Sequence, residues 1–151
     1  MTKVIAIMSM SLDGYVADAN DGVGEVFDWY FSGDVEVPTA SASSGMTFRV
    51  SPPSAEHLRG LVAEIGAAFA QAEEAAGGKE IGLAGGADVA QQFLRAGLVD
   101  EMQLHVVPVL LGGGTRLLDN LEGANLELEC IRVLAAPGVT HLKYRIGTPR
   151  V

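Results

Sequence analysis

The chain has 151 residues, of which 48% are hydrophobic and 19% charged, a composition typical of one globular domain with a substantial core. Its net charge of −9 at pH 7 argues against nucleic acid as a partner, because a phosphate backbone requires a basic protein face. No apolar run approaches the ~20 residues that cross a bilayer, and the single cysteine excludes an internal disulfide. We therefore expect a cytoplasmic protein with no membrane partner.

The N-terminal segment favours a strand that ends in a turn. Val4–Leu12 is apolar and β-compatible, and Asp13-Gly14 is a turn signal. Further on, Phe27–Phe31 holds four aromatic residues in five positions. Such a group either walls a ligand pocket or forms an apolar cluster beneath the loop that follows.

The middle of the chain is predicted to be helical. Ser54 is a good N-cap for a helix over 55–65, and a second helical pattern runs over 67–76. A short apolar strand is expected at Glu80–Ala84.

A diglycine then joins this strand to an amphipathic helix over Ala87–Ala96, in which Val89, Phe93 and Leu94 fall near one face. Gly85 and Gly86 let the backbone approach a ligand closely, and the first free N–H groups of the helix favour an anion. The arrangement is either a phosphate cradle or a tight strand-to-helix turn.

The C-terminal part predicts a long strand and a hairpin. Met102–Leu111 is an apolar strand in which Pro108 predicts a bulge or a sheet edge, and Gly112-Gly113-Gly114 follows it. Pro137-Gly138 supplies type II turn chemistry between Leu126–Val133 and Val139–Ile146.

Alternation along the last strand separates its two faces. Leu142, Tyr144 and Ile146 share one face, so His141 on the other is expected at the surface. Cys130 is expected to be a small buried hydrophobe. No spacing of His, Cys, Asp or Glu resembles a metal site, and we expect no metal.

Three stretches, taken in order, resemble a known family. Ser9–Ala17 reads SMSLDGYVA, Leu83–Asp88 reads LAGGAD, and Gly97–Glu101 reads GLVDE and leads into the PVLLGGG of Pro108–Gly114. They resemble signatures of the bacterial dihydrofolate-reductase-like proteins, which share their fold with the reductase domain of the bifunctional riboflavin-biosynthesis deaminase–reductase.

The resemblance implies an α/β three-layer sandwich with a mixed, mostly parallel sheet flanked by helices and a C-terminal antiparallel hairpin. It also implies an NADPH-dependent reductase that transfers a hydride to a C=N or C=O bond of a small polar substrate, pterin-, pyrimidine- or sugar-like.

Site residues follow from the matched motifs. Gly85, Gly86 and the N–H groups of Ala87 and Asp88 would hold the cofactor diphosphate, with the Asp88 carboxylate turned away to cap the helix. Backbone near Ser9 and Val16 would hold the nicotinamide amide.

Asp13 is the one carboxylate that both ends a strand and matches a motif. It is expected to have one of two roles: it binds the substrate or relays a proton, or it accepts hydrogen bonds from the backbone of its own turn. Trp29 and Tyr30 are candidate walls of the substrate pocket. Arg49 and Arg116 are candidate phosphate partners.

One departure from the family pattern leaves alternatives open. Members carry a further block on the order of 50 residues, within the range of one domain, that begins with a GR.T turn holding the adenosine end of NADPH. Nothing here matches that turn, so either half of the cofactor site is lost or the printed sequence omits it. The chain could then be a non-catalytic ligand-binding relic of the fold, or a dimerising scaffold that pairs through an exposed strand around Pro108. A homodimer is expected in any case, because a shortened sheet leaves an edge to cover.

Overall fold

The computed structural model describes residues 4–38, 47–60 and 86–147. The predicted helix over 67–76, the predicted strand Glu80–Ala84 and Gly85 lie outside these residues.

The chain divides into two compact units. We call Lys3–Asp28 with Gly85–Val151 the sheet unit, and Trp29–Ala84, which groups with Met1–Thr2, the aromatic unit. That the whole of 1–151 is one domain stays a prediction.

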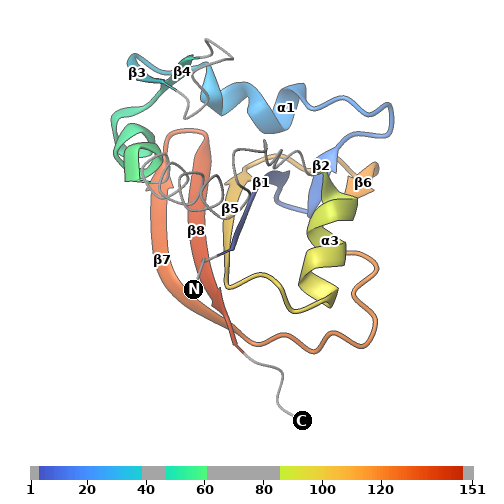
Figure 1. Cartoon of the computed structure of the whole chain (residues 1–151). Helices are drawn as coiled ribbons and strands as arrows, with labels where there is room; N and C mark the ends of the chain where they lie inside the picture. The colour runs from blue at the N-terminus through green and yellow to red at the C-terminus, as the bar shows by residue number, and fades with distance from the viewer. Residues whose placement is uncertain (1–3, 39–46, 61–85, 148–151) are drawn as a thin grey trace, which may run out of the picture. The chain divides into compact units, whose positions relative to one another are not determined.

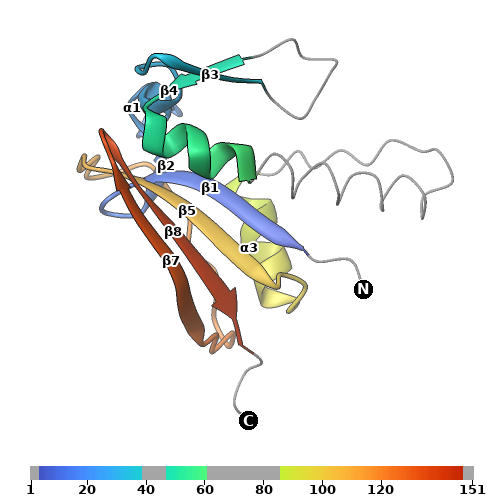
Figure 2. The same ribbon diagram turned by 90° about the vertical axis from the view of Figure 1, so that its left-hand side faces the viewer.

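The sheet unit is built on a four-stranded sheet with the strand order β1-β5-β8-β7 (Figures 1 and 2). β1 runs parallel to β5, whereas β5 with β8 and β8 with β7 are antiparallel. The α/β class and the mixed sheet are therefore confirmed, with one parallel and two antiparallel pairings among the described strands of this sheet. The strands are β1 Ile5–Ser11, β5 Glu101–Val107, β7 Leu128–Ala136 and β8 Val139–Ile146.

β5 lies in the interior of this sheet. It ends at Val107, directly before Pro108, which has no N–H to donate to a further ladder position. The expectation that the strand around Pro108 is an exposed edge is wrong, because β5 already has β1 on one side and β8 on the other. A second chain has no free strand to pair with there.

The C-terminal hairpin is confirmed. β7 and β8 are joined at Pro137-Gly138, where Gly138 has φ +74°, as the second central residue of a type II turn requires. β7 carries an irregularity between Cys130 and Arg132 that interrupts its alternation. Cys130 is exposed rather than buried, because β7 lies at the outer side of the hairpin and most of its side chains face solvent.

One face of the sheet packs on helix α3, which spans Ala87–Arg95 (Figure 2). Met102 and Leu104 of β5 form the centre of this core together with Ala87 and Leu117. Alternation places every second side chain of each strand on this face. The partly buried side chains packed against it are Met8, Met10, Val16, Ala90, Val106, Leu142, Tyr144 and Ile146.

The buried stripe of α3 differs from the predicted one. Ala87, Gln91 and Leu94 are buried, whereas Val89 and Phe93 are 39% and 40% exposed. The prediction counted apolar side chains alone, but a buried glutamine occupies the middle of the stripe. Residues 87, 91 and 94 have the spacing of one helix face.

Short elements complete the sheet unit. β2, Tyr15–Ala17, pairs with β6, Thr115–Arg116, and α1 spans Gly24–Phe27.

The aromatic unit has its own two-stranded sheet. β3, Val35–Pro38, pairs antiparallel with β4, Thr47–Val50, and a helix follows over residues 52–60. The short helix η1, Asp28–Tyr30, stands at the boundary of the two units. Among the described residues, no helix has the length and apolarity that a bilayer span requires.

Candidate functional site

Asp13 ties the end of β1 to the loop that follows β5. Its Oδ1 accepts the Ser11 hydroxyl at 2.6 Å and the Leu111 N–H at 3.1 Å, and its Oδ2 accepts the Gly112 N–H at 2.8 Å. The Leu12 N–H adds a bond of 3.0 Å to the Val109 carbonyl. Asp13 thus accepts hydrogen bonds from the backbone of a distant loop as well as from Ser11 and the backbone of its own turn.

These bonds fix the charge of Asp13. The hydrogen bond from Ser11, with those from the Gly112 and Leu111 amides, holds the pKa of the Asp13 carboxyl below its ordinary value, against a smaller opposing effect of desolvation. Asp13 is therefore a carboxylate at neutral pH, with both oxygens already accepting hydrogen bonds. Contact with a substrate or proton relay by Asp13 stays a prediction.

The glycines after β5 allow the chain to turn toward β2. Gly112 and Gly114 have φ of +70° and +123°, a region that side chains rarely adopt. A Cβ on Gly114 would overlap the carbonyl oxygen of Ala17, so the Gly114 backbone lies directly against β2. This close approach explains the last glycine of the cluster without a ligand.

Gly86, at the start of α3, differs from Gly112 and Gly114 in that its φ is negative. Its φ of −86° and ψ of −172° are extended backbone open to any residue, and an added Cβ would meet none of the described residues within 4 Å. No side chain of the described residues caps the helix, which leaves its N-terminal N–H groups without a side-chain acceptor there. Neither backbone conformation nor packing of the described chain requires a glycine here.

Asp88 turns away from the helix start, although not to cap it. Its Oδ2 accepts a hydrogen bond of 2.8 Å from the Gln92 side chain one turn further along. Ala87, by contrast, is buried in the core, so its side chain anchors the first turn while its N–H belongs to the open end.

Gln91 is a positioning residue that the sequence patterns missed. Its Nε2 donates to the carbonyls of Arg116 and Leu117, both at 3.0 Å, and its Oε1 accepts from Asn120 at 3.0 Å. The side chain is 4% exposed. It fixes α3 to β6, and the sequence patterns do not distinguish it from Gln92, the glutamine that follows it.

The other predicted cofactor residues lie on β1 and β2. Ser9 is buried on β1 beside His105 of β5, and Val16 of β2 packs partly buried against the core. β2, which contains Val16, pairs with β6. Gln91 of α3 in turn donates to β6, so β2, β6 and α3 form one connected set of contacts at the same end of the sheet unit (Figure 1). Contact of either residue with a nicotinamide stays a prediction.

The predicted arginines and aromatics are placed as follows. Arg116 lies over the Tyr15 ring, 5.1 Å from its centroid, and its Nε is 3.3 Å from Asp119. Arg49 stands on β4 in the aromatic unit, opposite Glu36 of β3. Neither placement tests the binding of phosphate.

Trp29 and Tyr30 stack on each other in the aromatic unit, with ring centroids 3.8 Å apart. Tyr30 also packs on Phe48, at 4.5 Å. Trp29 is 4% exposed, so these rings form the apolar cluster that was the alternative to a pocket wall. Their contact with a substrate stays a prediction.

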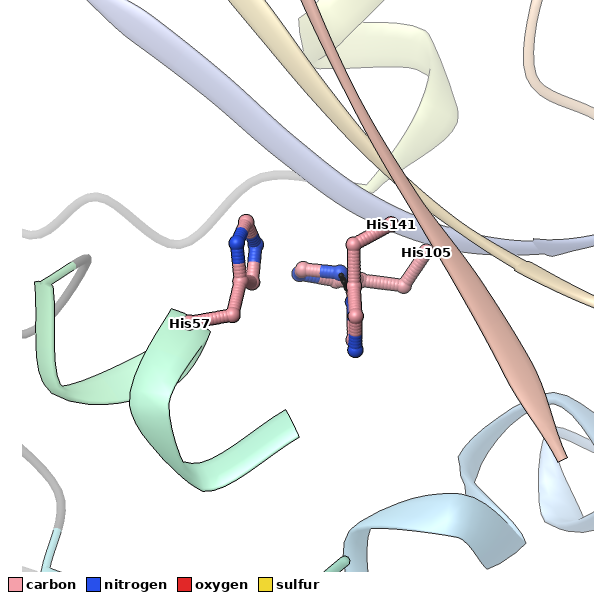
Figure 3. Close-up of side chains that lie close together, drawn as sticks. All are labelled: His57, His105 and His141. Carbon is pink, nitrogen blue, oxygen red and sulfur yellow. Dashed lines mark hydrogen bonds between the residues drawn. The ribbon is translucent and has the colours of Figure 1, made fainter. Parts of the chain in front are cut away.

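The sheet face opposite α3 is polar. His105 and His141 stand directly opposite each other on β5 and β8, and their Nδ1 atoms are 2.8 Å apart (Figure 3). His57, also labelled there, belongs to the aromatic unit. The expectation that His141 lies at the surface is wrong: it is 1% exposed, and Lys143 on the same side of β8 is also largely buried, whereas Arg145 further along is exposed.

A buried ion pair lies on the same face. Lys143 Nζ of β8 is 3.0 Å from Glu101 Oε2 of β5, with the two side chains 13% and 6% exposed. Alternation predicted which residues share this face, but not that the face is covered.

A family model described as the RibD C-terminal domain matches residues 46–142. The uncharacterized protein YyaP of Bacillus subtilis (strain 168) is 40% identical over 68 residues, which are 44% of this chain. The match spans 36% of YyaP, so this chain covers about a third of that relative.

Two solved structures share the fold. A protein from Shewanella sp. PV-4, described as a putative riboflavin biosynthesis protein, aligns over 98% of this chain and all of its own, with a TM-score of 0.57 and 20% identity. Acinetobacter baumannii RibD, form 2, aligns over 97% of this chain and 58% of its own, with a TM-score of 0.55 and 16% identity. At these identities the likeness shows the fold alone, and it confirms the predicted α/β fold of the reductase-domain type.

Proposed function

The chain belongs to the RibD C-terminal domain family, and we propose on this basis that it is a reductase that uses NADPH to reduce a C=N or C=O bond of a small polar substrate. The substrate class is pterin-, pyrimidine- or sugar-like. NADPH supplies the hydride when bound, and the protein supplies orientation and exclusion of water.

The observation that carries the proposal is the glycine at the start of α3. Gly86 has no conformational need to be glycine, and none of the described residues occupies the space where its Cβ would stand. A missing side chain at the N-terminus of a nine-residue helix lets a diphosphate approach the free N–H groups of Ala87 and Asp88. The Asp88 carboxylate, held by Gln92, does not stand over that approach.

The remaining contacts support a site at the carboxyl end of the parallel pair β1 and β5, where open α/β sheets bind ligands. Asp13 fixes the end of β1 to Gly112, and Gln91 fixes α3 to β6. Backbone groups that face a cofactor would therefore be held rigidly before it binds, which lowers the entropy lost on binding.

The test is a calorimetric titration of NADPH into the wild type and Gly86→Ala, with Gly24→Ala as the matched control. A Cβ on Gly24 also meets nothing within 4 Å, but Gly24 begins α1 and has no part in the proposed site. We expect Gly86→Ala to weaken NADPH binding about tenfold or more while leaving the melting temperature nearly unchanged, and Gly24→Ala to bind as the wild type does. Absence of NADPH binding by the wild type, or equal binding by Gly86→Ala, contradicts the proposal.

Two alternatives give different results. A ligand-binding relic binds NADPH but does not oxidise it, whichever pterin, pyrimidine or carbonyl compound is offered as substrate. Absorbance at the nicotinamide band measures the oxidation of NADPH.

A dimerising scaffold needs a free strand. Among the described strands of the sheet, β7 has one neighbour, and it exposes Leu128, Ile131 and Val133. Sedimentation of Val133→Lys against the wild type tests the expected homodimer: a dimer built on this edge dissociates, whereas an unchanged assembly shows that it uses another surface.

A further inference from the structure

The sheet unit has a polar face that packing alone does not explain. The α3 side of the sheet is lined by Met, Leu, Val, Tyr and Ile side chains. The other side carries a row of polar side chains from three adjacent strands, nearly all as buried as the core. These are Ser9, Glu101, Gln103, His105, His141 and Lys143.

The histidines form the centre of this face. His105 and His141 are 0% and 1% exposed, and their rings cross at 81° with centroids 5.0 Å apart. Directly opposed residues of an antiparallel pair bring their side chains into contact. Here that contact joins Nδ1 to Nδ1, so one imidazole donates and the other accepts.

Gln103 adds a second observation. It lies two residues before His105 on β5 and therefore on the same face, and it is 2% exposed. Its Oε1 has no hydrogen-bond partner among the described residues. A buried amide oxygen without a partner costs free energy, and such a group is often a site where something further binds.

We propose that His105 and His141 form a two-histidine site for a late first-row divalent cation such as Zn²⁺ or Co²⁺, with the Gln103 amide oxygen as a further donor. This goes beyond the reductase function and does not depend on it. It also departs from the expectation, drawn from residue spacing, that the chain binds no metal. The reason is geometric, because β5 and β8 bring together two histidines 36 positions apart.

The geometry requires only a small adjustment. Two nitrogens bound to a tetrahedral Zn²⁺ at its usual bond length are roughly 3.3 Å apart, against 2.8 Å for the Nδ1 atoms here. The cation takes the place of the proton between the two Nδ1 atoms, that proton moves to the Nε2 of the donor ring, and a small rotation of each ring opens the gap.

The donor set selects the class of cation. Imidazole nitrogens suit Zn²⁺, Co²⁺, Ni²⁺ and Cu²⁺, whereas Mg²⁺ and Ca²⁺ prefer several oxygen ligands. Among the described residues of this face, the buried carboxylate of Glu101 is engaged by Lys143 and the exposed carboxylate of Glu129 by Arg145, which leaves no set of charged oxygens for a hard cation. Mg²⁺ therefore does not compete.

The experiment is a calorimetric titration of ZnCl₂ at pH 7.5 into the metal-free protein, with Cys130→Ser as the background to remove the exposed thiol. We expect one Zn²⁺ per chain, unaffected by millimolar Mg²⁺. His105→Gln and His141→Gln should each weaken Zn²⁺ binding at least tenfold. Gln103→Leu should weaken it by less, and Gln92→Leu, a glutamine change on the exposed side of α3, should leave it unchanged.

Copper provides a readout that does not depend on the variants folding. The electron paramagnetic resonance spectrum of Cu²⁺ bound to the Cys130→Ser protein should show hyperfine coupling to two or more imidazole nitrogens. Coupling to one nitrogen or none overturns the proposal, as does Zn²⁺ binding that is unchanged in both folded histidine variants. NADPH titration of the same samples reports the reductase function separately.

Discussion

The carboxylate of Asp13 accepts the amide N–H of Gly112 at 2.8 Å, across 99 positions of the chain. Both residues stand where the parallel strands β1 and β5 end. This bond, with its companion to Leu111, makes Asp13 a clamp on the glycine loop.

Replacing Asp13 with Asn tests this clamp through its pH dependence. The folded state holds the pKa of Asp13 below its ordinary value, so its contribution to stability is present above about pH 4 and is lost as the pH falls further. The melting temperature of Asp13→Asn should lie several degrees below that of the wild type at pH 7. The two curves should converge toward pH 3. Asp88→Asn, on the exposed first turn of α3, is the control, and curves that stay parallel for Asp13→Asn contradict the clamp.

Gly114→Ala should destabilise the sheet unit by about 2 kcal/mol or more, because a side chain there is strained at positive φ and overlaps the Ala17 carbonyl oxygen. Gly113→Ala, one position earlier, meets open space and should change the free energy of unfolding by less than about 1 kcal/mol. Urea denaturation of both variants measures the difference. Equal stabilities would show that β2 shifts freely away from the glycine loop.

Gln91→Leu should cost about 2 kcal/mol of unfolding free energy, because it leaves the carbonyls of Arg116 and Leu117 without their donor. Gln92→Leu removes one exposed hydrogen bond to Asp88 and should be close to neutral. Chemical denaturation compares the two. A neutral Gln91→Leu would mean that water replaces the buried amide.

Lys143→Met should cost about 3 kcal/mol, because it leaves the buried Glu101 carboxylate without its cation. Arg145→Met breaks the ion pair with Glu129, whose side chains are 56% and 65% exposed, and should cost at most about 1 kcal/mol. Similar losses in the two variants would show that the Glu101–Lys143 pair is as well solvated as the outer pair.

Periodicity predicted the elements of the sheet unit well. The first strand, the helix after Gly86 and the Pro137-Gly138 hairpin all lie within a few residues of their predicted bounds. Each has a local signal, an apolar period or a turn dipeptide, that does not depend on the rest of the chain.

Burial was harder to predict, because it depends on what covers each face. His141 was expected at the surface since polar residues on one side of a strand usually face water. The same reasoning placed Val89 and Phe93 of α3 in the core and overlooked Gln91. Polar side chains that find partners across the fold become buried, and a one-dimensional pattern does not contain those partners.

Parallel pairing has a consequence for how this protein matures. The amide of Val4 reaches the side chain of Asp100, 96 positions further along, and every partner of β1 in the described sheet comes after that point. During synthesis the apolar Ile5–Ser11 segment therefore emerges from the ribosome long before its partner exists. Until β5 emerges, this segment has no neighbouring strand to pair with, and assembly of the sheet has to wait until β5 has been synthesised.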